Sequence, residues 1–168
     1  MFPLFHTPAP GAFDALPPRD VAALLATARS LQRAAEAGRA QPLLLRGKNL
    51  ALMCETDDQA DAALLRSAAS ELGARVSIVR TPPDRLGTPQ ELQHTARMLG
   101  QLYDAVACQG MAPELVRQIA AEAGVPVYDD IASPEHPTAR LAEMLAAGSA
   151  PDALRRFVLQ AVLLSTLA

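Results

Sequence analysis

Four acidic side chains gather in a short polar segment near the middle of the chain. The apolar run 50–54 precedes this segment, and its acids are Glu55, Asp57, Asp58 and Asp61. A helical pattern follows, and the turn between a strand and a helix is where open α/β folds hold a ligand, because the helix N–H groups and dipole point there. Four carboxylates without a cation would repel a phosphate from such a turn.

These acids allow two interpretations. Carboxylate oxygens are the ligands that divalent cations prefer, so a metal site is conceivable. Asp57 or Asp58 would also suit the N-cap of the following helix, and acids in a first turn interact favourably with the helix dipole. The spacing matches no calcium-loop pattern, so capping is favoured, and neither a metal nor another cofactor is expected.

His136 stands directly before Pro137, where another helical pattern begins. Its imidazole could donate a hydrogen bond to a carbonyl or anionic group of a ligand. Alternatively, the His-Pro pair simply starts the helix, and the ring caps it or bonds to the backbone. The residues alone leave both interpretations open.

The two cysteines, Cys54 and Cys108, end two predicted strands. In the strand order expected for this fold the two strands are neighbours about 4.8 Å apart, so a disulfide or redox pair is geometrically conceivable. Two buried thiols are far more common in cytosolic proteins, and this is the favoured interpretation.

Strand and helix patterns alternate along the chain. Strands are expected at 50–54, 75–80, 104–108 and 126–128. Helices are expected at 20–38, between the acidic turn and Gly73, and at 89–102, 113–123, 133–147 and 152–167. The helix after the acidic turn should bury Leu64, Ala68 and Leu72, with Leu65 and Ala69 beside them. Thr88 should cap the helix that begins at Pro89.

This alternation predicts an α/β fold with right-handed crossovers. We expect a single flavodoxin-like domain over residues 1–168, with a four-stranded parallel sheet of order 2-1-3-4 and helices on both faces. Residues 1–18 contain five prolines and are expected to form an extended arm.

The composition narrows the class of protein. The chain has 168 residues, of which 50% are hydrophobic, and a formal net charge of −3, so neither nucleic acid nor an anionic membrane is an expected partner. Two cysteines, no signal-peptide pattern and no apolar run of about 18 residues predict a cytoplasmic protein. One lysine against fourteen arginines, with abundant alanine, indicates a GC-rich bacterial source.

Apolar residues surround nearly the whole of the expected C-terminal helix, 152–167. Such a helix needs cover on more than one side. An exposed apolar stripe usually marks an interface, which predicts assembly of several copies. The alternative is a helix lying in a groove between the N-terminal helix and the sheet of a monomer.

Several segments resemble, in order and spacing, the carbamoyl-phosphate-binding half of the aspartate and ornithine carbamoyltransferases, and the likeness is greatest to the ornithine enzymes. These segments are AGRAQPLLLRGKNLALMCE, Leu72-Gly73, HTARMLGQLYDAV, VPVYD and His136-Pro137. The family's amino-acid-binding half is missing between Ala147 and Pro151.

The resemblance assigns the family's ligand positions to particular residues. Its phosphate-binding signature, Ser-Thr-Arg-Thr-Arg, falls on Asp58, Gln59, Ala60, Asp61 and Ala62. The serine and both arginines of the signature are therefore replaced.

Four further ligand positions lie elsewhere in the chain. The family's loop cation, which reaches a neighbouring subunit's site, falls on Thr88, and the arginine that contacts the carbamoyl oxygen falls on Gln109. His136 keeps the family's histidine, whereas the glutamine of the same motif is replaced by Ala139.

These replacements determine what function the resemblance implies. Each charge-assisted contact between arginine and phosphate contributes about 1.5–3 kcal/mol, and the family's cationic positions are lost here. No side chain remains to stabilise a leaving phosphate. We therefore expect a degenerate, non-catalytic domain with a binding, regulatory or scaffolding role, assembled as the homotrimer that the family forms, with a small molecule or a partner protein as its ligand.

Two enzymatic alternatives stay open. One is repurposed chemistry that uses His136 and the acidic turn on a cationic or neutral small molecule. The other is a residual carbamoyltransferase of amino-acid metabolism, with its site completed by another chain.

Overall fold

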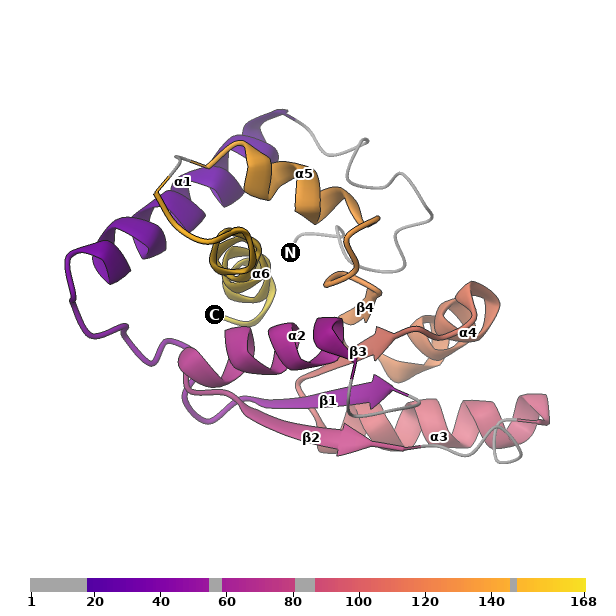
Figure 1. Ribbon diagram of the computed structural model, residues 1–168. Coiled ribbons are helices and arrows are strands. Elements are labelled where there is room, and N and C mark those ends of the chain that lie inside the picture. The colour runs from indigo at the N-terminus through magenta and orange to yellow at the C-terminus, as the bar shows by residue number, and fades with distance from the viewer. Residues whose placement is uncertain (1–17, 55–58, 81–86, 146–147) are drawn as a thin grey trace.

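A four-stranded parallel sheet forms the centre of the structure. The computed structural model describes residues 18–54, 59–80, 87–145 and 148–168. The strands are β1 (Asn49–Cys54), β2 (Arg75–Val79), β3 (Ala105–Gln109) and β4 (Val127–Asp129), in the order β2-β1-β3-β4 (Figure 1). The predicted fold class and strand order are confirmed, whereas most of the predicted proline-rich arm lies outside the described residues.

Six helices connect and flank the strands in the described residues. They are α1 (Pro18–Glu36), α2 (Ala60–Glu71), α3 (Pro89–Leu102), α4 (Pro113–Ala123), α5 (Pro137–Glu143) and α6 (Pro151–Leu167). Among these residues no helix has the length and apolar character needed to cross a lipid bilayer.

The predicted bounds of the helix near residue 140 are wrong. This helix, α5, begins only at Pro137 and ends at Glu143, short of the expected residue 147. Its end is tight, because the N–H groups of Met144 and Leu145 donate to the carbonyls three residues earlier.

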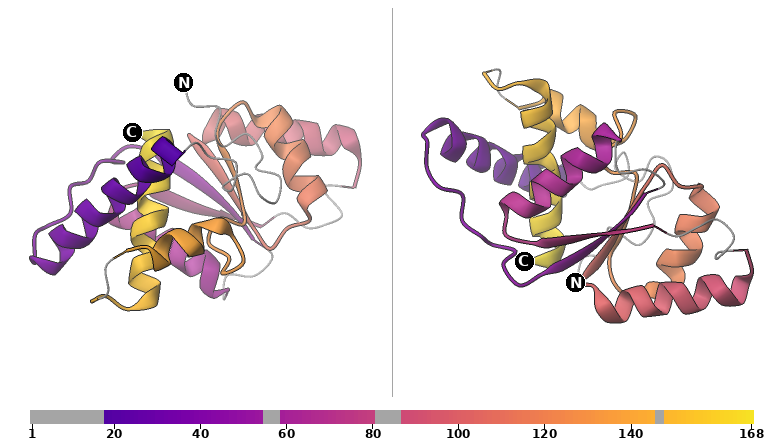
Figure 2. Two further views of the ribbon diagram at one scale, coloured as in Figure 1. Left: turned by 90° about the horizontal axis from the view of Figure 1, so that it is seen from above. Right: turned by 60° about the horizontal axis from the view of Figure 1, so that its bottom comes forward.

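Both faces of the sheet are covered by helices. Helices α1, α2, α5 and α6 lie on one side, and α3 and α4 lie on the other (Figure 2). Side chains of β1 alternate between the two layers: Leu50, Leu52 and Cys54 pack toward the first layer, and Ala51 and Met53 toward the second. This two-sided burial explains why β1 reads as an unbroken apolar run.

Helix α6 is enclosed by its own chain. It packs against α1, α2 and α5, and Figure 1 shows it end-on among them. Its buried residues point in several directions; they are Phe157, Val158, Leu159, Gln160, Ala161, Val162, Leu163 and Leu167. The expected exposed apolar stripe on this helix is therefore wrong. The helix is enclosed as in the alternative, but chiefly among α1, α2 and α5 and not between the N-terminal helix and the sheet alone.

Helix α2 turns the expected face to the core, with Leu64 as the exception. Its buried residues are Ala62, Leu65, Ala68 and Ala69. Leu64 is only half-buried, and Leu72 is buried just beyond the end of the helix.

Candidate functional site

The candidate site lies at the carboxyl edge of the sheet, where β1, β3 and β4 end side by side. Cys54 is paired with Gln109, and Cys108 with Asp129. Strands β3 and β4 run one residue later than predicted, so Gln109 is the last residue of β3. Asp58 lies outside the described residues, as do Glu55 and Asp57.

Helix α2 begins at this edge without an acidic N-cap. The helix starts at Ala60, which is exposed, and the N-cap is Gln59, whose side chain makes no capping hydrogen bond. Asp57 or Asp58 as the N-cap is therefore wrong. The Gln59 side chain instead lies against Gly110, where an added Cβ would stand 3.2 Å from Gln59 Oε1.

Asp61, in the first turn of α2, faces an arginine from the far end of the chain. Arg155 Nη2 of α6 lies 3.5 Å from Asp61 Oδ1, and these side chains are 20% and 31% exposed. Arg155 also donates a hydrogen bond to the carbonyl of Ala132 and lies 3.8 Å from Asp152 Oδ1. One guanidinium thus ties the start of α2 to α6 and to the loop after β4.

Sequence reasoning missed Arg155. The sequence did contain an indication, because Arg155 and Arg156 are the two basic residues of a largely apolar helix. Only one of them reaches the site, since Arg156 Nε lies 3.2 Å from Glu71 Oε2 near the other end of α2.

Gln109 is buried, and its amide is used within the chain. Its Nε2 donates to Asp130 Oδ1 at 2.8 Å, and its Oε1 accepts from the backbone N–H of Ala132 at 3.3 Å. Asp130 Oδ1 also accepts from the N–H of Gly110 at 3.2 Å, and Asp130 itself has a positive φ of 52°. The Gln109 side chain therefore holds the loop after β4, in a role that the sequence did not indicate.

His136 is the N-cap of α5. Its Nδ1 accepts a hydrogen bond from the backbone N–H of Thr138 at 3.2 Å and lies 3.1 Å from the Thr138 hydroxyl. Burial lowers the pKa of His136 to about 4, so the imidazole is neutral at pH 7. The capping interpretation is confirmed, and His136 brings no positive charge to the edge. Ala139 follows on α5 and is half-buried.

Thr88 is the N-cap of α3, as predicted. Its hydroxyl accepts from the N–H of Glu91 at 3.2 Å, and its own N–H donates to Glu91 Oε2 at 3.2 Å, which forms a capping box. Capping α3 is therefore a structural role that accounts for the Thr88 side chain without a ligand.

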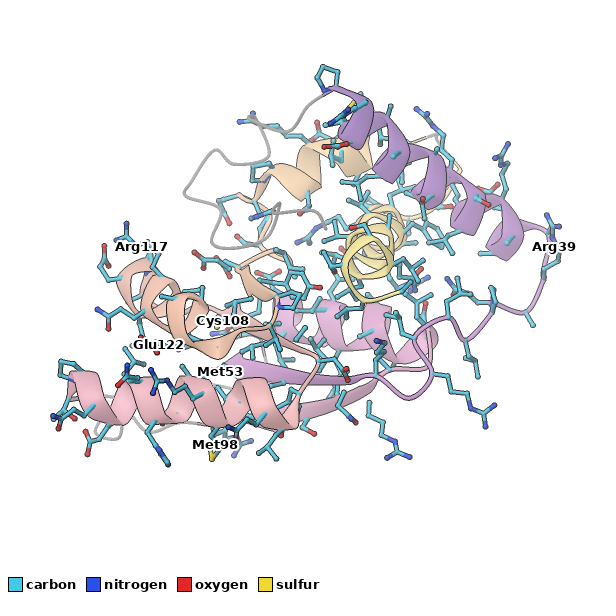
Figure 3. All side chains as sticks on the ribbon, turned by 180° about the vertical axis from the view of Figure 1, so that it is seen from behind. Arg39, Met53, Met98, Cys108, Arg117 and Glu122 are labelled. Atoms are coloured by element: carbon cyan, nitrogen blue, oxygen red, sulfur yellow. The ribbon has the colours of Figure 1, made fainter. Side chains whose placement is uncertain are left out.

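The two cysteines cannot form a disulfide in this fold. They face opposite layers, because Cys108 is paired with Met53 and not with Cys54. Met53 and Cys108 lie together on the side of α3 and α4 (Figure 3). Burial, with the neighbouring Asp129 carboxyl, raises the pKa of Cys108 to about 12, so this thiol stays protonated. The predicted pair of buried free thiols is confirmed.

Within the described parts of the chain, no group of three or more histidine, cysteine, aspartate or glutamate residues could hold a metal ion. Three of the four acids of the predicted metal alternative lie outside those parts.

The structure is an open parallel α/β sheet, a class of fold in which ligands are commonly held at the carboxyl edge of the strands. The chain belongs to the aspartate/ornithine carbamoyltransferase family: residues 12–148 match the family's carbamoyl-phosphate-binding domain.

Curated relatives agree with this membership. A catabolic ornithine carbamoyltransferase of Burkholderia mallei is 37% identical over 127 residues, which cover 76% of this chain and 38% of the relative. One from Chromobacterium violaceum is 36% identical over 129 residues, with the same coverage. The match thus spans less than two fifths of the length of these relatives.

Solved structures show the same fold. Ornithine carbamoyltransferase from Pyrococcus furiosus superposes with a TM-score of 0.63 at 23% identity, over 75% of this chain and 40% of that one. The catalytic subunit of aspartate transcarbamoylase from M. jannaschii superposes with a TM-score of 0.61 at 19% identity, over 77% of this chain and 42% of that one.

Proposed function

We propose that this chain is a non-catalytic member of the carbamoyltransferase family, a relative of the carbamoyl-phosphate-binding domain with a binding, regulatory or scaffolding role. The observation that carries the proposal is the ion pair between Asp61 and Arg155. The resemblance assigns Asp61 to the family's phosphate signature, and the ion pair sets this carboxylate against a cation, Arg155.

This ion pair opposes phosphate binding in two ways. The Asp61 carboxylate supplies the negative charge that Arg155 would otherwise offer to an anion. The same carboxylate lies in the first turn of α2, where it occupies the favourable field of the helix N-terminus. Both side chains are partly buried, so salt screens the pair less than it would an exposed one.

The neighbouring positions support the same conclusion. Ala62, where the signature has its second arginine, is 3% exposed and packs into the core beneath α2. An arginine at that position would bury its charge among apolar side chains, which is costly without a partner. The neutral His136 and the internally bonded Gln109 offer no cation in compensation.

A calorimetric titration tests the proposed role of Asp61. The parent protein should bind neither inorganic phosphate nor carbamoyl phosphate appreciably at millimolar concentrations. Asp61→Asn should bind phosphate at least tenfold more tightly than the parent, with a Kd on the order of 1–10 mM, because Arg155 loses its internal counter-charge. Asp152→Asn is the matched control, since Asp152 also lies near Arg155 but is 84% exposed.

The outcomes separate the alternatives. Micromolar binding of carbamoyl phosphate by the parent would contradict the proposal and favour a residual carbamoyltransferase. An Asp61→Asn variant that folds yet gains nothing would show that the ion pair is not what excludes the anion.

Assembly as a homotrimer in a bacterial cytoplasm remains part of the proposal and rests on family membership, since the enclosed α6 no longer supports it. Gel filtration coupled to light scattering should give three times the chain mass of 17.7 kDa. A single species at 17.7 kDa across micromolar concentrations would contradict the trimer.

A further inference from the structure

The outer edge of β2 is unpaired within the described residues. Strand β2 is an edge strand that is bonded only to β1 among these residues, so one side of its backbone has no strand partner there (Figure 1). We define the β2 edge surface as this strand edge together with Leu43, Leu44, Arg46 and Arg75. Unpaired strand edges are the places where an extended segment of another chain can add as a further strand.

The turn before β1 adds apolar area to this surface. Leu43 and Leu44 are 55% and 53% exposed, although the next residue, Leu45, is fully buried. The turn is held at the start of β2, because the N–H of Leu45 donates to the carbonyl of Leu72 at 2.8 Å. A Cβ added to Gly73, which has a φ of +89°, would stand 3.0 Å from the Cβ of Leu43.

The charge on the β2 edge surface is positive. The exposed guanidinium groups of Arg46 and Arg75 have no ion-pair partner among the described residues. Some other arginines are paired with acids, as Arg97 is with Glu122 and Arg117 with Glu114. On the β2 edge surface, two cations without an ion-pair partner among the described residues lie beside two exposed leucines, in a chain of net charge −3.

We propose that the β2 edge surface binds an extended acidic segment of a partner protein, which adds to the sheet as a strand beside β2. Backbone hydrogen bonds to β2 would hold the segment. Its carboxylates would pair with Arg46 and Arg75, and an apolar side chain would cover Leu43 and Leu44.

Charge disfavours a second copy of this chain as the occupant. A closed twofold pairing of two β2 edges is antiparallel, and if centred on Ser77 and Ile78 it sets Arg75 of one copy opposite Arg80 of the other. Like charges directly opposite each other destabilise paired strands.

The experiment uses the full chain and a fluorescein-labelled peptide that alternates glutamate with valine and leucine. Fluorescence anisotropy should give a Kd on the order of 10–100 μM at low salt. Peptides with lysine in place of glutamate, or with a central proline that blocks strand addition, should bind at least tenfold more weakly. Arg75→Glu should weaken binding of the acidic peptide at least tenfold, whereas Arg39→Glu, an exposed arginine beyond the end of α1 (Figure 3), should not.

Amide shifts in an ¹⁵N NMR titration should concentrate in β2 and the turn before β1. No binding of the acidic peptide at about 1 mM would overturn the proposal. Equal binding of the proline-containing peptide or of heparin would also overturn it, because charge alone would then suffice. A dimer that dissociates on Arg75→Glu would assign the surface to a second copy instead.

Discussion

Replacing Leu163 with alanine should lower the free energy of unfolding by about 3–5 kcal/mol. Leu163 lies in α6 with no exposed surface, in the core layer formed with α1, α2 and α5. Removing its side chain leaves a cavity in this core layer. The surrounding helices are held in place by their other contacts, so they can fill the cavity only in part. Chemical denaturation, monitored by circular dichroism, measures the loss.

The matched control is Ser165→Ala, two residues further along the same helix. Ser165 is exposed, and its hydroxyl donates only to the carbonyl of Val162, so its loss should change stability by no more than about 0.5 kcal/mol. The effect of Leu163→Ala should be the same at low and high protein concentration. A loss that grows on dilution would show that α6 is stabilised by contacts between subunits.

Gly100→Ala should destabilise the protein by about 2–3 kcal/mol, although alanine is the better helix former by about 1 kcal/mol. Helices α3 and α4 pack so closely at this point that a Cβ on Gly100 would stand 1.7 Å from the carbonyl oxygen of Ala123. The obstacle is backbone, so the two helices must move apart and lose packing against β1 and β3. Thermal unfolding should show a Tm lower by about 5–10 °C.

Gln101→Ala serves as the control for Gly100→Ala. Gln101 is the next residue of α3 and is exposed, so its substitution tests the helix without the crossing. Its expected effect is within about 0.5 kcal/mol. A Gly100→Ala variant as stable as the parent would mean that α3 and α4 cross at a wider spacing.

Much of the fold was predictable from local patterns. The apolar run of β1, the proline at the start of α3 and the glycine after α4 each mark an element through its own residues. The predictions that failed concern surroundings. The length of α5 depends on how its end packs, and the covering of α6 depends on the neighbouring α5 together with α1 and α2, which are distant in sequence.

The candidate site divides in the same way. Family resemblance placed Gln109, His136 and Thr88 at ligand positions, and the structure shows each side chain in a hydrogen bond within the chain. The acceptor for Gln109, Asp130, was not foreseen. Its role depends on a backbone conformation with positive φ, which aspartate tolerates better than most residues.

By itself the sequence determined the α/β class, because hydrophobic periodicity is a property of short segments. The expected strand order and the assignment of the phosphate signature came from the resemblance to a known fold and family. Only the tertiary structure decided which charges neutralise each other and which layer each cysteine faces. Asp61 and Arg155 are 94 positions apart, and an ion pair depends on distance in space. Cys54 and Cys108 face opposite layers because Cys54 is paired with Gln109, and one step along the strand from Gln109 to Cys108 reverses the face to which the side chain points.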